Sequence, residues 1–161
     1  MVDLSTRTRP DHNLKNDPVD IKSLVRPLSL FFFFSLMNET KSIHFTIKTI
    51  EKLKKLKPGS DLNGMMIKFA TELFLKNENT EVYITKNVGE FWVLPRDLEL
   101  GPWKEFHKKI SKKELVSLLW GLVIKIPETE ILKALDVSQG THRFRVASAL
   151  KKLGSNTFLL K

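Results

Sequence analysis

The chain of 161 residues has a formal net charge of +9, is 42% hydrophobic and 28% charged, and contains no cysteine. This length and composition predict one or two small folded domains with hydrophobic cores. The lack of cysteine excludes a disulfide framework and thiolate metal sites, and it suits a reducing cytoplasm. The positive charge favours a polyanionic partner, nucleic acid first and an anionic membrane second.

The first 21 residues are polar, contain Pro10 and Pro18, and predict a flexible arm. Residues 28–37 are the most hydrophobic stretch, but they fall well short of the ~20 residues that a membrane-spanning helix needs. The leader before them is long and acidic at Asp11 and Asp17, unlike a signal peptide. We therefore expect a buried core helix in a cytoplasmic protein with no membrane span. An export signal or a membrane-surface element is the alternative.

Two amphipathic helices are predicted between residues 42 and 75. In residues 42–56, apolar side chains recur at Ile43, Ile47, Ile50, Leu53 and Leu56. In residues 62–75, a broader apolar face consists of Met65, Met66, Phe69, Ala70, Leu73 and Phe74. Residues 57–60, which include Pro58 and Gly59, separate the two helices. Residues 22–80 are thus predicted to form an N-terminal domain of three packed helices.

The following segment has a different character. Its β-prone runs at residues 81–85 and 90–94 predict a short β-hairpin, and Gly101 and Pro102 mark the end of a linker, so residues 81–102 are predicted to be hairpin and linker. Helical periodicity then resumes at Trp103, which predicts a second helical domain at residues 103–161. The predicted fold class is mainly α, with two small helical domains.

Two helices separated by a tight turn are predicted within residues 127–153. Pro127 fits the first turn of the first helix, where its missing N–H is not needed, and the apolar stripe of that helix breaks at residues 136–138. Asp136 tolerates a left-handed backbone conformation, and Ser138 can cap the amides of the helix that follows. A second helix from Gln139 onward gives a helix-turn-helix.

This second helix has an apolar side and a basic side. Its apolar residues are Val146, Ala149, Leu150 and Leu153, with His142 as a partly buried packing residue one turn earlier. No acidic residue follows Asp136, a pattern that favours a helix entering the major groove of DNA. The predicted contacts are base contacts from Arg143 and Arg145, base or phosphate contacts from Gln139 and Thr141, and phosphate contacts from Lys151 and Lys152. The alternative is a solvated basic face without a ligand.

No pattern in the chain indicates an enzyme. The four histidines lack ligand spacing with a supporting carboxylate, and neither a glycine-rich phosphate loop nor a serine or threonine nucleophile motif occurs. We therefore expect no catalytic residue, no metal and no cofactor.

The C-terminal third carries a set of residues that fits a known family. These residues are Glu130, Ile131, Ala134, Leu135, Val137, Ser138, Gly140, Thr141, Arg145 and the run from Ala149 to Leu153. The set resembles the promoter-recognising domain of bacterial RNA polymerase sigma factors, most closely the two-domain extracytoplasmic-function group. Ile110 and residues 113–122 resemble the helix that precedes this motif in the family.

The N-terminal half resembles the same family in the order of its parts. Residues 30–40 resemble its first helix and loop, residues 46–56 the helix that docks on polymerase, and residues 57–73 the loop and helix that meet the upstream promoter element. The chain departs from the family at residues 41–45, which are basic and apolar where the family is acidic. It departs again at residues 64–66, where the family has an aromatic residue and arginines.

This resemblance implies a sigma-like transcription initiation factor whose partners are RNA polymerase core, promoter DNA and an anti-sigma protein. One alternative is a DNA-binding transcriptional regulator of sigma-like architecture that does not open promoters. Another is a basic interaction module, or adaptor, that binds an acidic protein.

Overall fold

Residues 20–77 and 99–157 are described by the computed structural model, and every regular element within these ranges is a helix. The elements are the 3₁₀-helix η1 (Ile21–Leu24), α1 (Val25–Leu36), α2 (Glu39–Lys54), α3 (Leu62–Lys76), α4 (Gly101–Lys109), α5 (Lys112–Leu118), the π-helix η2 (Leu119–Val123), α6 (Glu128–Leu135) and α7 (Gln139–Thr157). The prediction of a mainly α protein is confirmed for this part of the chain. The hairpin predicted at residues 81–94 lies outside it, as does the predicted arm apart from Asp20, which caps η1, and Ile21, which begins it.

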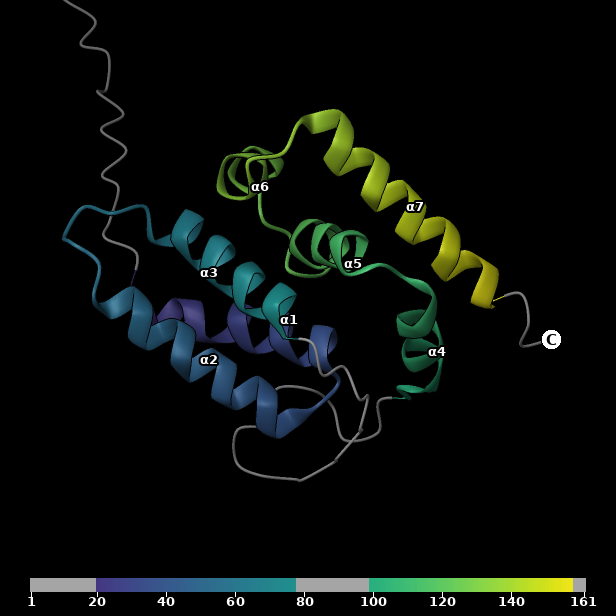
Figure 1. Cartoon of the computed structure of the whole chain (residues 1–161), viewed down its shortest axis with the longest axis horizontal. Helices are drawn as coiled ribbons and strands as arrows, with labels where there is room; N and C mark the ends of the chain where they lie inside the picture. The colour runs from purple at the N-terminus through teal and green to yellow at the C-terminus, as the bar shows by residue number, and fades with distance from the viewer. Residues whose placement is uncertain (1–19, 78–98, 158–161) are drawn as a thin grey trace, which may run out of the picture.

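The first three α-helices pack on one another, with α1 in contact with both α2 and α3 (Figure 1). The fully buried side chains of α1 are Leu28, Phe31 and Phe32. This confirms the buried core helix predicted at residues 28–37. α1 ends where Met37 adopts a left-handed conformation with φ 52°, and Asn38 then caps α2 by accepting a hydrogen bond from Lys41 N at 2.9 Å.

α2 packs on the core through a face that coincides only in part with the one that its apolar spacing predicts, because Leu53 is buried and Ile50 packs against the core as predicted. Ile43 and Ile47 are 39% and 53% exposed, so their predicted place on a buried face is wrong. The buried side chains of α2 are Glu39, Ser42, Thr46, Thr49 and Leu53. The hydroxyls of Ser42 and Thr49 donate to backbone carbonyls of the preceding turn at 2.6 and 2.8 Å, so these polar groups are satisfied within the chain. Their small size lets α2 approach the large side chains of α1 closely.

α3 begins after a turn that requires glycine. Gly59 has φ 85°, a left-handed conformation that glycine adopts without steric cost, and Asp61 then accepts a hydrogen bond from Gly64 N at 2.9 Å as the N-cap. Met66, Ala70 and Phe74 are buried, and the other predicted apolar side chains of this helix are partly buried against the same core. The helix predicted at residues 62–75 is confirmed.

α4 starts earlier than predicted, and a short break divides it from α5. Gly101 and Pro102 form the first turn of α4, two residues before the predicted helix start at Trp103. A proline is tolerated there because no helical N–H is needed. At the break, Ser111 Oγ accepts from Glu114 N and the Glu114 carboxylate accepts from Ser111 N, which is a capping box that starts α5.

One hydrophobic core joins the two halves of the chain. Phe31 of α1 stacks on Trp120 of η2 with ring centroids 4.2 Å apart and an interplanar angle of 10°. The Trp120 indole N–H donates to Thr71 Oγ1 of α3 at 3.0 Å. α6 also packs against α3, which places the C-terminal helices over the N-terminal three (Figure 1). The division into domains at 22–80 and 103–161 stays a prediction, and these segments share a core.

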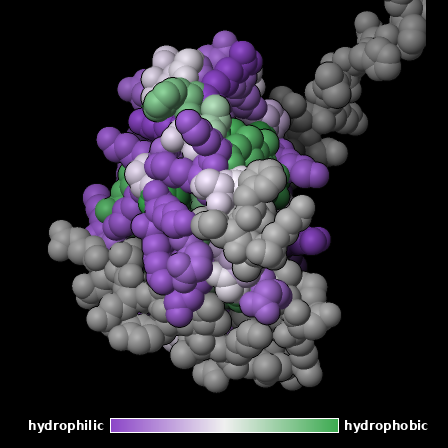
Figure 2. Space-filling model, turned by 90° about the vertical axis from the view of Figure 1, so that its right-hand side faces the viewer, coloured by the Kyte–Doolittle hydropathy of each residue, from purple (hydrophilic) through white to green (hydrophobic). Residues whose placement is uncertain are grey.

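On the side where α4 and α7 lie, the surface of the described residues that is visible is mostly hydrophilic, with smaller hydrophobic areas between the polar side chains (Figure 2). Among residues 99–155, the large apolar side chains that are most exposed are Leu122, Phe144 and Leu150. Within residues 20–77 and 99–157, no helix combines the length and the apolar character that crossing a bilayer requires.

Candidate functional site

Residues 127–157 form two helices joined by a turn at residues 136–138. Pro127 is the N-cap of α6 with ψ 134°, so it precedes the helix instead of lying in its first turn as predicted. Its carbonyl accepts from the amides of Glu130 and Ile131, so it still satisfies the start of α6. α6 ends at Asp136, whose φ of 51° and ψ of 52° confirm the predicted left-handed conformation.

Ser138 caps the start of α7, as predicted. Its Oγ accepts a hydrogen bond from Thr141 N at 3.1 Å and donates one to Thr141 Oγ1 at 2.9 Å. The Ser138 carbonyl accepts from His142 N at 3.0 Å, which is the first hydrogen bond of the helix. The amide and the hydroxyl of Thr141 are therefore both hydrogen-bonded to Ser138 in the turn, while the side chain of Thr141 stays exposed.

One side of α7 faces α5 and η2, and it differs in part from the predicted apolar side. His142 and Ala149 are buried, which confirms His142 as a packing residue, and Val146 and Leu153 are half-buried. Leu150 is 45% exposed, so its predicted place on the apolar side is wrong. Since successive helical residues are rotated by about 100°, the burial of Ala149 turns Leu150 toward solvent.

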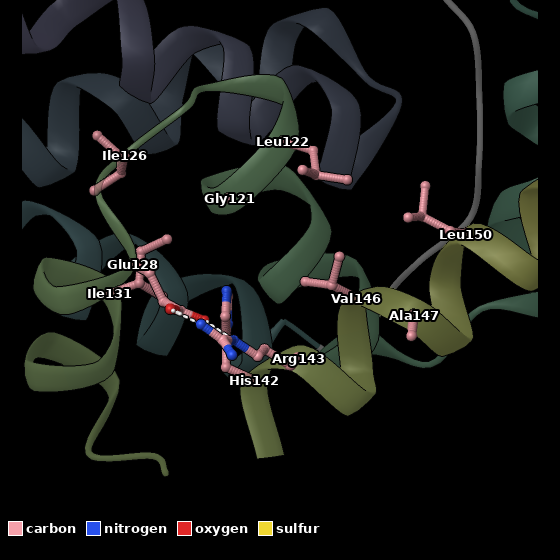
Figure 3. A pocket seen from close by; sticks show the side chains of 10 residues that line it. All are labelled: Gly121, Leu122, Ile126, Glu128, Ile131, His142, Arg143, Val146, Ala147 and Leu150. Carbon is pink, nitrogen blue, oxygen red and sulfur yellow. Dashed lines mark hydrogen bonds and ion pairs between the residues drawn. The ribbon is translucent and has the colours of Figure 1, made fainter. Parts of the chain in front are cut away.

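Glu128, the first residue of α6, accepts hydrogen bonds from two side chains of α7 across the turn, and Figure 3 shows one of them, Arg143. Arg143 Nε donates to Glu128 Oε1 at 2.9 Å, and Arg143 Nη2 donates to Oε2 at 3.0 Å. Gln139 Nε2 donates to the same Oε2 at 3.0 Å. These hydrogen bonds, first from Arg143 and then from Gln139, lower the pKa of Glu128 to about 2, so its carboxylate is ionised near neutral pH. Two predicted DNA-contacting residues are thus brought together on one carboxylate.

The remaining basic residues of α7 are placed differently from one another. Lys151 is exposed, and Arg145 is half-buried. Neither forms a hydrogen bond or ion pair with another side chain in residues 20–77 or 99–157. Lys152 Nζ instead donates to Glu114 Oε2 at 2.7 Å, and its side chain is 36% exposed. The positive charge of Lys152 is therefore directed at α5.

Glu114 fastens α7 to α5. Its carboxylate accepts from Lys152 Nζ, from Ser148 Oγ at 2.5 Å and from Ser111 N at 2.9 Å, while its side chain is only 12% exposed. Burial raises the pKa of Glu114, but these hydrogen bonds outweigh burial and lower the pKa to about 2. The network joins the C-terminal half of α7 to α5, whereas in the first turns of α7 Gln139, Thr141 and Arg143 are exposed.

A shallow apolar groove of about 340 Å³ lies between η2, α6 and α7, next to the Glu128–Arg143 pair (Figure 3). Its lining residues include Leu122, Ile126, His142, Val146 and Leu150. In the described residues no group of histidine, aspartate and glutamate side chains is arranged to hold a metal ion.

Two residues of this region were not predicted from the sequence. Phe144 is 73% exposed on α7 beside Arg143, and its departure from the apolar spacing of the helix is the signal that could have identified it. Glu128 could not have been found in this way, because it lies 15 positions from Arg143 and only the turn brings the two together.

Comparisons of the chain with protein-family models, with curated proteins and with solved structures find no match.

Proposed function

We propose that the protein is a sigma-like transcription initiation factor that binds RNA polymerase core and recognises promoter DNA through α6 and α7. The arrangement of α6, a tight turn and an α7 without acidic residues, whose first turns are exposed, carries the DNA-binding part of this proposal. A DNA-binding helix-turn-helix places its second helix in the major groove, with N-terminal residues at the base edges. The start of α7 has the exposure and the charge that this mode of binding needs.

The proposed base contacts come from the exposed first turns of α7. Arg143 has the planar fork that donates two hydrogen bonds to a guanine edge. Phe144, directly beside it, offers an apolar surface suited to the methyl group of thymine. Gln139 lies one turn earlier and Thr141 two residues earlier, both near the helix N-terminus, where backbone dipoles favour a phosphate.

The proposed phosphate contacts depend on which basic side chains of α7 already form an ion pair within the described part of the protein. Lys151 is exposed and unpaired among the described residues, so it is suited to a phosphate contact. Arg145 has no ion-pair partner there either, and its proposed contact stays the base or near-base contact that the sequence predicts. Lys152 would have to leave the Glu114 carboxylate to reach a phosphate. We therefore assign Lys152 a smaller share of the DNA affinity than the sequence pattern implies.

The polymerase-binding part of the proposal is supported by the resemblance of residues 46–56 to the docking helix of sigma factors. Ile43 and Ile47 are exposed side by side on α2, one turn apart, and such apolar side chains are suited to a protein contact. Lys48 adds a positive charge beside them.

Two alternatives have observations in their favour. The departures from sigma factors at residues 41–45, which bear on polymerase docking, and at residues 64–66, which bear on promoter opening, favour a DNA-binding regulator that does not open promoters. The exposed Leu122, Phe144 and Leu150 favour an adaptor that binds an acidic protein, because exposed apolar side chains beside positive charge fit such a partner.

Pull-down of purified RNA polymerase core, combined with DNA footprinting and transcription assays, separates these functions. A sigma-like factor binds core, protects a defined duplex together with core and starts transcripts from it. A regulator protects the duplex without core, whereas an adaptor binds neither core nor naked DNA. Absence of both core binding and transcript initiation would contradict the initiation factor.

A further inference from the structure

The Glu128 carboxylate and the Arg143 guanidinium form a side-on pair whose geometry leaves one edge of the arginine available. A guanidinium has five N–H groups, and here Nε and one N–H of Nη2 point at the two carboxylate oxygens. The outer edge, formed by Nη1 and the second N–H of Nη2, is not used by this pair. The Arg143 side chain is still 65% exposed while it is bonded to Glu128.

We propose that Glu128 is a positioning residue for base recognition, which orients the outer edge of Arg143 toward a guanine. The inference rests on the proposed recognition of DNA by α7. The O6 and N7 atoms of guanine accept two parallel hydrogen bonds, the pattern that this outer edge presents. Glu128 would stay bonded to the side edge of Arg143 while the outer edge contacts the base.

Two physical effects of the Glu128–Arg143 pair should increase the sequence specificity of DNA binding. A free arginine side chain must give up rotamer freedom when it is fixed on a base, whereas Arg143 is already fixed by two hydrogen bonds. The negative charge of Glu128 also opposes binding to phosphate on every sequence equally. The pair therefore lowers non-specific binding while it preserves the guanine contact. This increases the difference in affinity between a duplex with the recognised guanine and duplexes without it.

Gln139 belongs to the same arrangement. One N–H of its amide donates to Glu128 Oε2, which leaves its carbonyl oxygen and its second N–H for an adenine edge or a phosphate. Because one carboxylate orients both side chains, loss of Glu128 should disturb recognition at two neighbouring base pairs, with the larger effect at the one contacted by Arg143.

The test uses the full chain, a duplex selected by the wild-type protein from a random pool, and duplexes that differ from it by single base pairs. Glu128→Gln should lower discrimination at the guanine position by about tenfold, without weakening binding to an unrelated duplex. Glu130→Gln is the matched control, because it removes the same charge from the first turn of α6 where no side-chain hydrogen bond to the described residues is lost, and it should keep full discrimination. Arg143→Lys should lose discrimination at the same position, and the double variant should lose no more than Arg143→Lys alone.

Several outcomes would overturn the inference. One such outcome is unchanged discrimination in Glu128→Gln. This includes the case in which the variant binds all duplexes more tightly by the same factor, because Glu128 would then only neutralise the positive charge of Arg143. A wild-type protein without any sequence preference would remove the proposed function and this inference together. A preference lost in Arg143→Lys but kept in Glu128→Gln would remove the positioning role alone.

A readout without DNA separates positioning from folding. In the free wild-type protein, the NMR signal of the Arg143 Nε–H group should show restricted motion, and Glu128→Gln should release it while the thermal unfolding of the two proteins stays similar. An equally mobile Arg143 side chain in both proteins would contradict the positioning role, whatever the protein binds.

Discussion

His142 occupies the buried side of α7, directly beside Arg143 in the sequence and facing the groove that η2 lines. It is 4% exposed, and its Nδ1 atom is buried without a hydrogen-bond partner among the described residues. Burial lowers the pKa of His142; Glu128 opposes this change, and Arg145 and Arg143 reinforce it. The imidazole is therefore neutral in the folded protein near pH 7, and it acts as a packing side chain.

A pH dependence of stability follows from this environment. In the unfolded chain the imidazole takes up a proton near its ordinary pKa of about 6.5, whereas the folded protein takes it up only at lower pH. The free energy of unfolding should therefore fall as the pH drops below about 6.5, since the unfolded state then binds more protons. His107, whose pKa is also lowered by burial, adds to the same trend. NMR titration of the His142 ring should give a pKa below the ordinary value, and a value at or above it would contradict the burial.

At the same scale, the sequence predicted local contacts well and distant ones poorly. The left-handed Asp136 follows from the residue type at that position, and the Ser138 cap lies three residues from the amide that it satisfies, so residue type and spacing sufficed. The Glu128–Arg143 pair depends on the angle between two helices. No short sequence pattern predicts that angle. The DNA-contacting roles of the predicted residues stay predictions.

At the scale of elements, α2 shows where helical periodicity is insufficient. The spacing of its isoleucines correctly indicates a helix, but Ser42, Thr46 and Thr49 are buried together with the predicted Leu53, whereas Ile43 and Ile47 are exposed. Hydroxyls that bond to the preceding turn are nearly as suited to close helix packing as alanine is. Hydrophobicity alone therefore placed only part of the buried face correctly: Ile50, Leu53 and Leu56 pack on the core, and Ile43 and Ile47 do not.

A pair of neighbouring substitutions tests this orientation of α2. Ile47→Gln changes a side chain that is 53% exposed and should alter the free energy of unfolding by no more than about 0.5 kcal/mol. Thr46→Gln inserts a longer polar side chain into a buried contact and should cost about 1–3 kcal/mol. Urea unfolding of both variants measures the difference. A greater loss in Ile47→Gln than in Thr46→Gln would mean that the isoleucine face is the buried one.

The contact between α5 and α7 depends on the Glu114 network. Glu114→Ala should lower the free energy of unfolding by roughly 2 kcal/mol, because it removes three hydrogen bonds to a charged acceptor and leaves Lys152 half-buried without its partner. The matched control is Glu105→Gln, an exposed pair with Lys108 that should have little effect. Since the pKa of Glu114 is lowered to about 2, its contribution should be present above pH 4.5 and be lost as the pH falls toward 2. Equal stability of Glu114→Ala and the wild type at pH 7 would contradict this role.

At the scale of the whole molecule, the N-terminal and C-terminal halves are joined by the stack of Phe31 on Trp120 and by the hydrogen bond from Trp120 to Thr71. Sequence periodicity predicted most of the helices on each side of this contact. It could not predict the contact itself, because the apolar spacing around Trp120 indicates only that this residue is buried and not which helix it contacts. A shared core implies that the two halves depend on each other for stability.

Trp120→Ala should therefore destabilise the whole protein by about 3–5 kcal/mol, as expected for removal of a fully buried indole. In the wild-type protein, urea unfolding followed by circular dichroism and by tryptophan fluorescence should give coincident single transitions. Two separate transitions, with only one of them shifted in Trp120→Ala, would show that the halves fold as independent domains.

Also at this scale, a net charge of +9 and an α7 without acidic residues predict that DNA binding depends strongly on salt. The most direct measurement is selection of duplexes from a random pool by the full chain, with wild type and Arg143→Ala in parallel. We expect the wild type to enrich a motif with a guanine at one position and to bind it less tightly as salt rises. Arg143→Ala should lose the preference for guanine and about tenfold or more in affinity for the motif. Enrichment of no motif by the wild type, or of the same motif with equal affinity by both proteins, would contradict recognition of DNA through α7.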